Sequence, residues 1–295
     1  MGAVGVNPRY IYASLVPGEI QTECDHYKVK ISFFPMQKRN THVSGDSTSQ
    51  LENTCPHAFT ALQSSHERSR AHAMELNVEL AELRLEGGLL AGRIHLPVPV
   101  QISAGQYFLA ASGRPDEALA AIVFPAGNMD GWLDLAPPLP SSWIVGMPLH
   151  LRGPLGRGFQ LPSLVQRVVL AALDITADRL RLLWLQALTR SAGVVLCTQR
   201  LPGNLPDEVE VLPLESLPEA VAWAEYLALD GTLPQVMEWK SRLKAVGSRA
   251  EALIHIPMPC GGVGRCGACS VLTRRGWKFA CEDGPVFNLN ELEEK

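Results

Sequence analysis

The sequence predicts a multidomain protein of β and α/β architecture: a small antiparallel β-barrel, then a parallel α/β domain, then a short metal-binding domain. Three observations predict this order. Short alternating strands separated by Gly and Pro fill residues 76–160, apolar strands alternate with helical segments over 165–256, and four of the seven cysteines stand between positions 260 and 281. A chain of 295 residues, 46% apolar and 19% charged, is long enough for two or three globular domains.

The predicted boundaries divide the chain into four segments. Residues 1–73 are an atypical N-terminal extension, rich in Ser, Thr and Asn, which we expect to be disordered or not translated. Within it, only residues 27–34 have the pattern of a short strand. The barrel is expected over 74–163, the α/β domain over 164–250 and the metal-binding domain over 251–295.

Each element follows from its residue pattern. Residues 78–85 alternate, Gly87-Gly88 turn the chain and residues 89–96 return, which predicts a β-hairpin. Further barrel strands are expected at 106–110, 119–124, 132–135 and 148–152. Apolar runs predict α/β strands at 167–173, 193–198, 208–212 and 252–256, and helical patterns predict helices at 176–189, 218–223 (after Ser216 as a cap) and 234–246. A final hairpin is expected around Arg274-Arg275-Gly276, before a polar, acidic tail.

The C-terminal cysteines have the spacing C-x5-C-x2-C-x11-C, at Cys260, Cys266, Cys269 and Cys281. A [2Fe–2S] cluster needs four thiolates directed at one compact core, and the glycines between these cysteines allow the backbone to approach inorganic sulfur. Structural zinc, the first alternative, usually has two C-x2-C pairs, whereas this segment has one. Disulfides, the second, are disfavoured in a reducing compartment. We therefore predict these four cysteines as ligands of a [2Fe–2S] cluster.

Other cysteines and nearby cations have simpler interpretations. Cys197 ends an apolar strand and is expected to be a buried core thiol. Two Cys-x-His pairs, Cys24/His26 and Cys55/His57, have zinc-binding residue types, but their spacing matches no usual finger. Four basic side chains of the cysteine segment are expected to offset the negative charge of the thiolates: Arg265, Arg274, Arg275 and Lys278.

Charge and hydropathy exclude several function classes. Lys plus Arg is 26 against 30 for Asp plus Glu, a formal net charge of −4, which gives no electrostatic basis for binding nucleic acid or an anionic membrane. No stretch reaches the roughly 18–20 apolar residues that span a bilayer, and residues 1–30 lack the pattern of a signal peptide. We expect a cytoplasmic protein with no nucleic-acid or membrane partner.

The run from Cys260 to Phe287, with Cys281-Glu282-Asp283-Gly284-Pro285-Val286-Phe287 at its end, resembles the electron-transfer subunits of dihydroorotate dehydrogenases, in the ferredoxin-reductase-like superfamily. The resemblance implies a flavin-binding barrel, a nucleotide-binding α/β domain and a [2Fe–2S] domain. It also implies electron exchange with a catalytic flavoprotein subunit, through the cluster and FAD, with NAD as the terminal acceptor. The first cysteine spacing departs from the family's usual C-x4-C by one residue, which a Gly-rich loop can absorb.

The nucleotide sites depart further from the family. Two segments resemble the family's flavin contacts and carry over as FAD-binding candidates: Gly105, Gln106, Tyr107, Gly153, Pro154, Gly156 and Gly158. The segment expected to hold the flavin phosphate is residues 120–124 in this chain, and none of its side chains carries a positive charge or a hydroxyl group. The Gly-rich turn of the family corresponds to residues 171–176, which contain no glycine and place Asp174 where a phosphate would approach. The family's Cys-Gly-Pro segment corresponds to Leu229-Asp230-Gly231. FAD is thus carried over as a second cofactor, and NAD is not expected.

Two functions follow as hypotheses. The first is an iron–sulfur electron-transfer subunit, not a complete enzyme by itself, that relays single electrons to or from a catalytic flavoprotein of the dihydroorotate dehydrogenase kind in pyrimidine biosynthesis. The second is a non-catalytic regulatory or assembly module that keeps the fold and uses the metal site as a structural or redox-sensing element.

Overall fold

The computed structural model describes residues 21–24, 27–30, 73–243 and 249–293, and the chain separates into two compact units, 1–54 and 55–295. In the first unit, β1 (Gln21–Cys24) pairs antiparallel with β2 (Tyr27–Lys30), so the strand expected over 27–34 is seen for its first four residues. His26, Cys55 and His57 lie outside the described residues. The zinc site considered for the two Cys-x-His pairs is therefore not tested.

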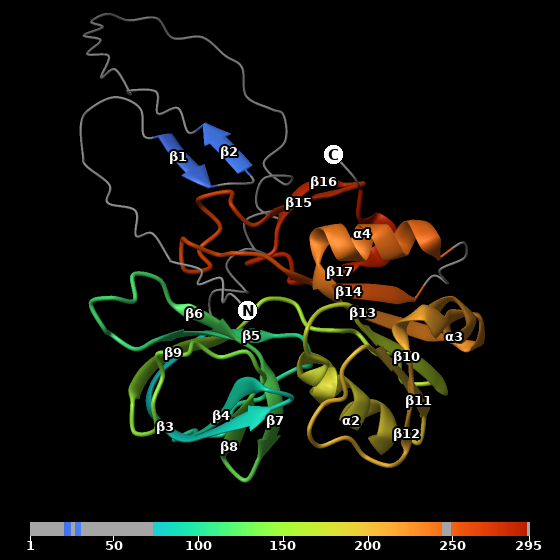
Figure 1. Ribbon diagram of the computed structural model, residues 1–295, viewed down its shortest axis with the longest axis horizontal. Coiled ribbons are helices and arrows are strands. Elements are labelled where there is room, and N and C mark those ends of the chain that lie inside the picture. The colour runs from blue at the N-terminus through green and yellow to red at the C-terminus, as the bar shows by residue number, and fades with distance from the viewer. Residues whose placement is uncertain (1–20, 25–26, 31–72, 244–248, 294–295) are drawn as a thin grey trace, which may run out of the picture. The chain divides into compact units, whose positions relative to one another are not determined.

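The first half of the second unit is an antiparallel sheet of seven strands in the order β6-β5-β9-β3-β4-β8-β7 (Figure 1). Its strands are β3 (Met74–Glu86), β4 (Leu89–His95), β5 (Tyr107–Ala111), β6 (Ala121–Val123), β7 (Pro125–Met129), β8 (Trp132–Leu135) and β9 (Pro148–Leu155). The predicted hairpin is confirmed as β3 and β4, joined at Gly87-Gly88.

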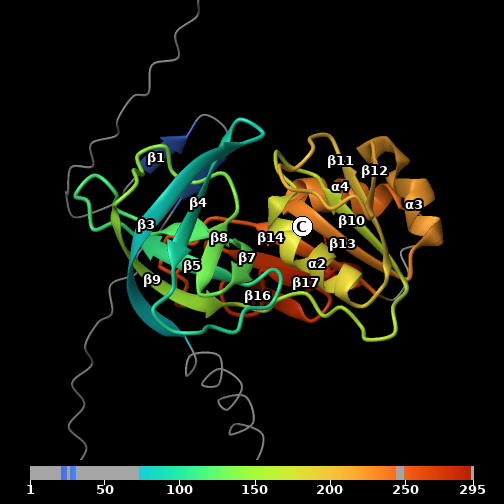
Figure 2. The same ribbon diagram turned by 90° about the horizontal axis from the view of Figure 1, so that it is seen from below.

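The long strand β3 is the central strand and joins the two halves of this sheet, because its first residues pair with β9 and its last residues pair with β4 (Figure 2). Side chains of the strands alternate between the two faces of the sheet. Leu80, Ile94 and Leu133 are fully buried in the core on the inner face. The expected strand at 119–124 was too long: it is the short β6, and β7, which follows directly after Phe124, was not predicted.

A six-stranded sheet follows, in the order β12-β11-β10-β13-β14-β17. Its strands are β10 (Arg167–Ala172), β11 (Gly193–Thr198), β12 (Val209–Leu212), β13 (Tyr226–Thr232), β14 (Ala250–His255) and β17 (Val286–Asn288). All neighbours are parallel except β14 and β17. Successive residues of β10 alternate between two cores, which explains its continuous apolar run: Val168 packs on the side of α2, and Val169 on the side of α3 and α4 (Figure 1).

The helices are α2 (Arg181–Thr189), α3 (Leu217–Trp223) and α4 (Leu233–Arg242), with short 3₁₀ turns η1 (Asp178–Leu180) and η2 (Leu214–Ser216) before α2 and α3. Ser216 is the N-cap residue of α3, as predicted, but its side chain makes no capping hydrogen bond. The capping box belongs instead to α4, where Thr232 and Gln235 exchange hydrogen bonds. None of the helices in the described ranges is long and apolar enough to cross a membrane.

The cysteine-bearing segment leaves the sheet at β14 and returns to it at β17, the neighbouring strand. Between them lie a glycine-rich loop and the predicted hairpin, β15 (Ser270–Thr273) and β16 (Gly276–Phe279). The 3₁₀ turn η3 (Leu289–Glu291) follows β17. The polar tail therefore contains a strand that was not predicted, and that strand makes the sheet mixed instead of purely parallel.

Candidate metal centre

The loop between β14 and β15 carries three of the four cysteines, and Cys281 follows β16. Four glycines of this loop have positive φ angles between 65° and 72°, a region that side chains disfavour: Gly261, Gly262, Gly264 and Gly267. These residues fold the backbone back on itself, so that Cys260 and Cys266, six positions apart in the sequence, come close together. At Gly264 a β-carbon would also displace the flexible carboxylate end of Glu282, so the positive φ is the stronger reason for glycine there.

The four thiols form two pairs. The sulfur atoms of Cys269 and Cys281 lie 3.3 Å apart, and Cys266 hydrogen-bonds to Cys260. The backbone N–H of Ala268 donates to the sulfur of Cys266 at 3.5 Å. A two-iron cluster with four cysteine ligands has two per iron, so two pairs of thiols fit it. A single ion is not matched, since no three His, Cys, Asp or Glu side chains of the described segments gather around one point.

The thiols differ in their readiness to ionise. Burial raises the pKa of Cys260, but hydrogen bonds from the backbone of Val263, Arg265 and Cys266 outweigh it and bring the pKa to about 6. Burial and the neighbouring Cys269 together raise the pKa of Cys281 to about 12. Cys260 is therefore a thiolate at neutral pH, whereas Cys281 needs the positive charge of a metal to lose its proton.

Cys197 behaves differently from the four loop cysteines. It is fully buried in β11, between the sheet and its helices, and burial raises its pKa to about 11. The prediction of a core thiol is confirmed.

The barrel holds the cysteine loop through two side chains. Tyr107 on β5 is fully buried, and its hydroxyl donates to the carbonyl oxygen of Cys281 at 3.2 Å. Arg152 on β9 donates to the carbonyl oxygens of Gly261 at 3.1 Å and Gly262 at 3.5 Å. The sequence analysis did not single out Arg152, because no local pattern distinguishes an arginine in a strand that reaches a loop 109 residues later in the chain.

Two of the cations expected to offset the thiolate charge are paired with carboxylates instead. Arg275 lies 3.1 Å from Glu291, and Lys278 lies 3.2 Å from Asp283. Asp283 also accepts a hydrogen bond from the backbone N–H of Phe279, and this bond closes the turn that contains Cys281. These two basic side chains contribute little net charge to the centre.

The seven FAD-binding candidates come together in one place, where the barrel meets the C-terminal segment. Gln106 donates to the carbonyl oxygen of Gly156 at 3.1 Å. A β-carbon at Gly105 would overlap Val286 and Phe159, and one at Gly156 would overlap the backbone of Gly284 and the ring of Pro285. A β-carbon at Gly153 would overlap Phe108, one at Gly158 would overlap Ala104, and the bond before Pro154 is cis. These positions are filled by protein, and their role as flavin contacts stays a prediction.

A charged network fills the crevice at the carboxyl ends of β10 and β13, where the strand order of the sheet reverses. Asp174 follows β10, and Asp230 lies on β13, fully buried. Arg179 binds both carboxylates at 3.1 Å. His255, at the end of β14, contacts Asp230 through Nε2 at 2.5 Å and Asp174 through Nδ1 at 3.3 Å.

This network determines the protonation of its members. Burial lowers the pKa of His255, but the two carboxylates raise it more, so the net shift is upward. The hydrogen bond from His255 is the main cause of the lowered pKa of Asp174; for Asp230, burial opposes Arg179 and His255, which prevail and lower it. The crevice thus holds two carboxylates, an arginine and a histidine whose protonated form the carboxylates favour.

A dinucleotide does not fit this crevice. Ligands of open α/β sheets bind at the point where the strand order reverses, with their phosphates on glycine-rich backbone. Here Asp174 and Asp230 occupy that point, and the cations near them are already bound to carboxylates. The residues present therefore do not match the pyrophosphate of NAD.

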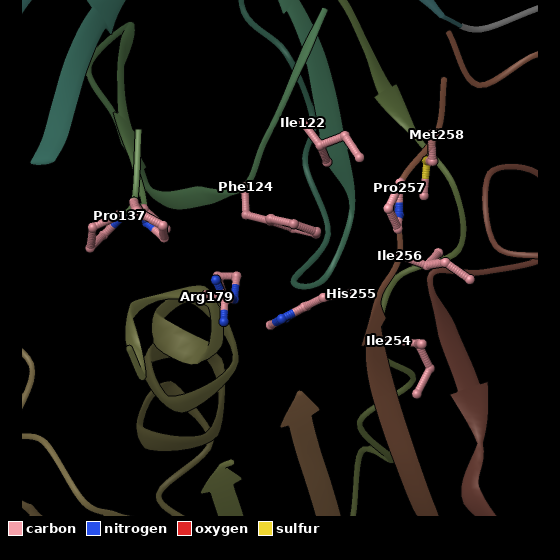
Figure 3. A pocket seen from close by; sticks show the side chains of 11 residues that line it. Ile122, Phe124, Pro137, Arg179, Ile254, His255, Ile256, Pro257 and Met258 are labelled. Carbon is pink, nitrogen blue, oxygen red and sulfur yellow. The ribbon is translucent and has the colours of Figure 1, made fainter. Parts of the chain in front are cut away.

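A cavity of about 320 Å³ opens beside the network (Figure 3). Arg179 and His255 lie close together beneath Phe124, whose ring centroid is 6.1 Å from that of His255. The remaining walls are apolar, with Pro137 on one side and Ile122, Ile256 and Met258 toward the other (Figure 3). Its size and walls suit a planar ring, but among its lining residues only Arg179 and His255 are basic, and both are engaged by Asp174 and Asp230.

The chain has the fold of ferredoxin reductases, and its C-terminal segment is similar to an iron–sulfur cluster binding domain. Residues 257–293 match the family model described as the iron-sulfur cluster binding domain of dihydroorotate dehydrogenase B. A solved structure of an NADH-dependent reduced ferredoxin-NADP oxidoreductase has the same fold, with a TM-score of 0.59 and 17% identity, over 73% of this chain and 89% of that one.

More particularly, the chain resembles the electron-transfer subunits of dihydroorotate dehydrogenase B. It is 28% identical, over 52% of its length and 68% of the relative's, to a putative subunit of this kind from Thermotoga petrophila. A 35-residue segment, 12% of each chain, is 49% identical to sulfhydrogenase 1 subunit gamma of Pyrococcus furiosus.

Proposed function

We propose that this protein is an iron–sulfur electron-transfer subunit of a flavin-dependent oxidoreductase, of the dihydroorotate dehydrogenase B kind that serves pyrimidine biosynthesis. It would exchange single electrons with a catalytic flavoprotein subunit, with no role for nucleic acid or membrane, and it is not a complete enzyme by itself. The observation that carries the proposal is the gathering of four thiols in two pairs on a glycine-folded loop, within the segment that matches the cluster-binding family.

The ligands in this proposal are Cys260, Cys266, Cys269 and Cys281. When bound, a [2Fe–2S] cluster supplies one-electron transfer. The chain's own residues would hold it asymmetrically: Cys269 and Cys281 are buried against the barrel, whereas Cys266 is exposed. The exposed side gives a partner protein close access, and the buried side excludes water. Thiolate ligands persist in a reducing compartment, which supports a cytoplasmic location.

We propose FAD as a second cofactor of this protein, but not NAD. The apolar cavity beside Ile122 and Phe124 supports a flavin ring, but its lining offers no uncommitted cation for a diphosphate. The network of Asp174, Asp230, Arg179 and His255 argues against a nicotinamide dinucleotide. Protein partners would then be the sources and acceptors of electrons.

The test is direct analysis of the full chain purified without oxygen. We expect iron and acid-labile sulfide in equal amounts, about two of each per chain, with the absorption and EPR spectra of a [2Fe–2S] cluster. Cys266→Ser should lose these signals, whereas the matched Cys197→Ser, in the core of the sheet, should keep them. A protein with zinc and no sulfide would contradict the proposal. Flavin released by denaturation and measured by fluorescence would decide the place of FAD.

A second function deserves testing because the charged network fills the crevice where a nucleotide would bind. The chain would then be a regulatory or assembly module with a structural or redox-sensing metal site. Rapid reduction of the cluster by the catalytic flavoprotein and its substrate supports the relay. A cluster that this partner cannot reduce, in a complex that still assembles, supports the module.

A further inference from the structure

Arg152 connects the barrel to the cysteine loop. It lies on β9, where its backbone pairs with Glu75 on β3 and Leu109 on β5, so its Cα is fixed by two neighbouring strands. Its guanidinium spans the carbonyl oxygens of Gly261 and Gly262, the two residues that follow Cys260. Both carbonyls belong to residues with positive φ, which directs them away from the helical or extended course of the chain.

The charge of Arg152 is available to the metal centre. In residues 73–243 and 249–293 no carboxylate forms a salt bridge with it, in contrast to Arg275 and Lys278, which are paired with Glu291 and Asp283. Its acceptor Gly261 directly follows Cys260, and its acceptor Gly262 lies against the side chain of Cys281, with 3.9 Å between a β-carbon at Gly262 and that of Cys281. The guanidinium is therefore held beside residues that adjoin two of the proposed ligands.

We propose that Arg152 is a positioning residue that raises the reduction potential of the cluster by holding a fixed positive charge against its loop. The inference rests on the proposed function, since it needs the cluster. Reduction adds one negative charge to the centre, and a nearby cation stabilises the reduced form more than the oxidised form. Because Arg152 is only partly exposed, water screens this interaction incompletely.

The test is an EPR-monitored redox titration of the full chain. Arg152→Gln removes the charge and should make one-electron reduction about tenfold less favourable, a shift of about 59 mV to lower potential. Arg152→Lys keeps a cation on the strand and should restore most of the difference. The matched control is Arg190→Gln, since Arg190 also binds two backbone carbonyls, those of Leu161 and Pro162, away from the cysteine loop. It should leave the potential unchanged.

A fourth variant separates charge from loop geometry. Tyr107→Phe removes a further side-chain hydrogen bond from the barrel to the cysteine segment, that to the carbonyl oxygen of Cys281, without removing a charge. A potential that falls as far in Tyr107→Phe as in Arg152→Gln would overturn the inference, because loosening the loop would then explain both. Equal potentials in the wild type and Arg152→Gln would overturn it as well, while the proposed function would stand.

If Arg152→Gln fails to bind the cluster, the potential of Arg152→Lys decides between a role through charge and a role through loop geometry. Lysine cannot span two carbonyl oxygens as a guanidinium does, so a role in geometry alone predicts a potential well below that of the wild type, and a role through charge predicts a potential near it. Absence of iron and sulfide from the wild type would instead contradict the proposed function itself.

Discussion

At the scale of single residues, the buried ionic network around Asp230 is the most unusual feature of the α/β domain. A fully buried carboxylate is costly unless cations and hydrogen bonds compensate it, and here Arg179 and His255 both do so. Removing one partner leaves an uncompensated charge in the interior. The network therefore contributes to stability only as a complete set.

His255→Gln should lower the free energy of unfolding by about 3 kcal/mol, because Asp230 loses one of its two cations. The contribution of His255 depends on pH. Its pKa is raised in the folded state by Asp230 and Asp174, against burial and Arg179, so this stabilisation is complete below about pH 6.5 and declines as pH rises through the folded pKa. Urea unfolding at pH 6 and pH 8.5, buffers chosen on either side of about 6.5, measures both effects.

The matched control for this prediction is His150→Gln. His150 is half exposed and lies 3.8 Å from an exposed Glu75, so its loss should change stability by less than about 0.5 kcal/mol at either pH. Equal effects of the two substitutions would show that the network does not stabilise the fold.

At the scale of elements, the strands that the sequence revealed are those with a clear local pattern. The hairpin of β3 and β4 alternates over many residues, and β10 and β11 are continuous apolar runs. β13 was missed because its second half, Asp230 to Thr232, reads as a polar turn, although the structure buries Asp230 and Gly231. β17 is only three residues long, too short for any period, and exists because β14 offers it a free edge.

The residues of the metal centre and of the charged network also divide into those with a local sequence pattern and those without one. The four cysteines and the glycines between them could be proposed from spacing and composition, since both belong to one continuous segment. Arg152, Tyr107 and His255 reach their partners only through tertiary contacts between segments far apart in the chain, and their chemistry follows from those contacts. Sequence patterns placed Tyr107 among the flavin candidates, and the structure adds its bond to Cys281.

The junction between the barrel and β17 can be tested at Gly105. A β-carbon there would lie 2.7 Å from Val286 and 2.9 Å from Phe159, in addition to the strain of a positive φ of 86°. Gly105→Ala should destabilise the protein by about 2–4 kcal/mol, from overpacking and backbone strain together. Thermal or urea unfolding measures the effect.

Gly113→Ala isolates the backbone part of this cost. Gly113 also has a positive φ, 71°, but nothing lies within 4 Å of a β-carbon there. Its substitution should cost only about 1 kcal/mol. If the two glycines cost the same, the packing of Val286 and Phe159 around Gly105 is not as tight as the structure has it.

At the scale of the whole molecule, the chain has the fold of ferredoxin reductases, while the crevice at the carboxyl ends of β10 and β13 carries acidic residues. A ligand that binds the folded state raises the unfolding temperature, so NADH provides a simple test. We expect no shift of the melting temperature with NADH or NAD, and no bleaching of the cluster by NADH under conditions where dithionite reduces it. A clear stabilisation by either nucleotide would contradict the interpretation of the network formed by Asp174, Asp230, Arg179 and His255.

The cysteine-bearing excursion begins at β14 and ends at β17, two strands that hydrogen-bond to each other. The sheet therefore already brings the ends of the excursion together, and most of the entropy of closing it is lost during folding, before any iron arrives. Synthesis of the polypeptide and delivery of iron and sulfide can then be separate events.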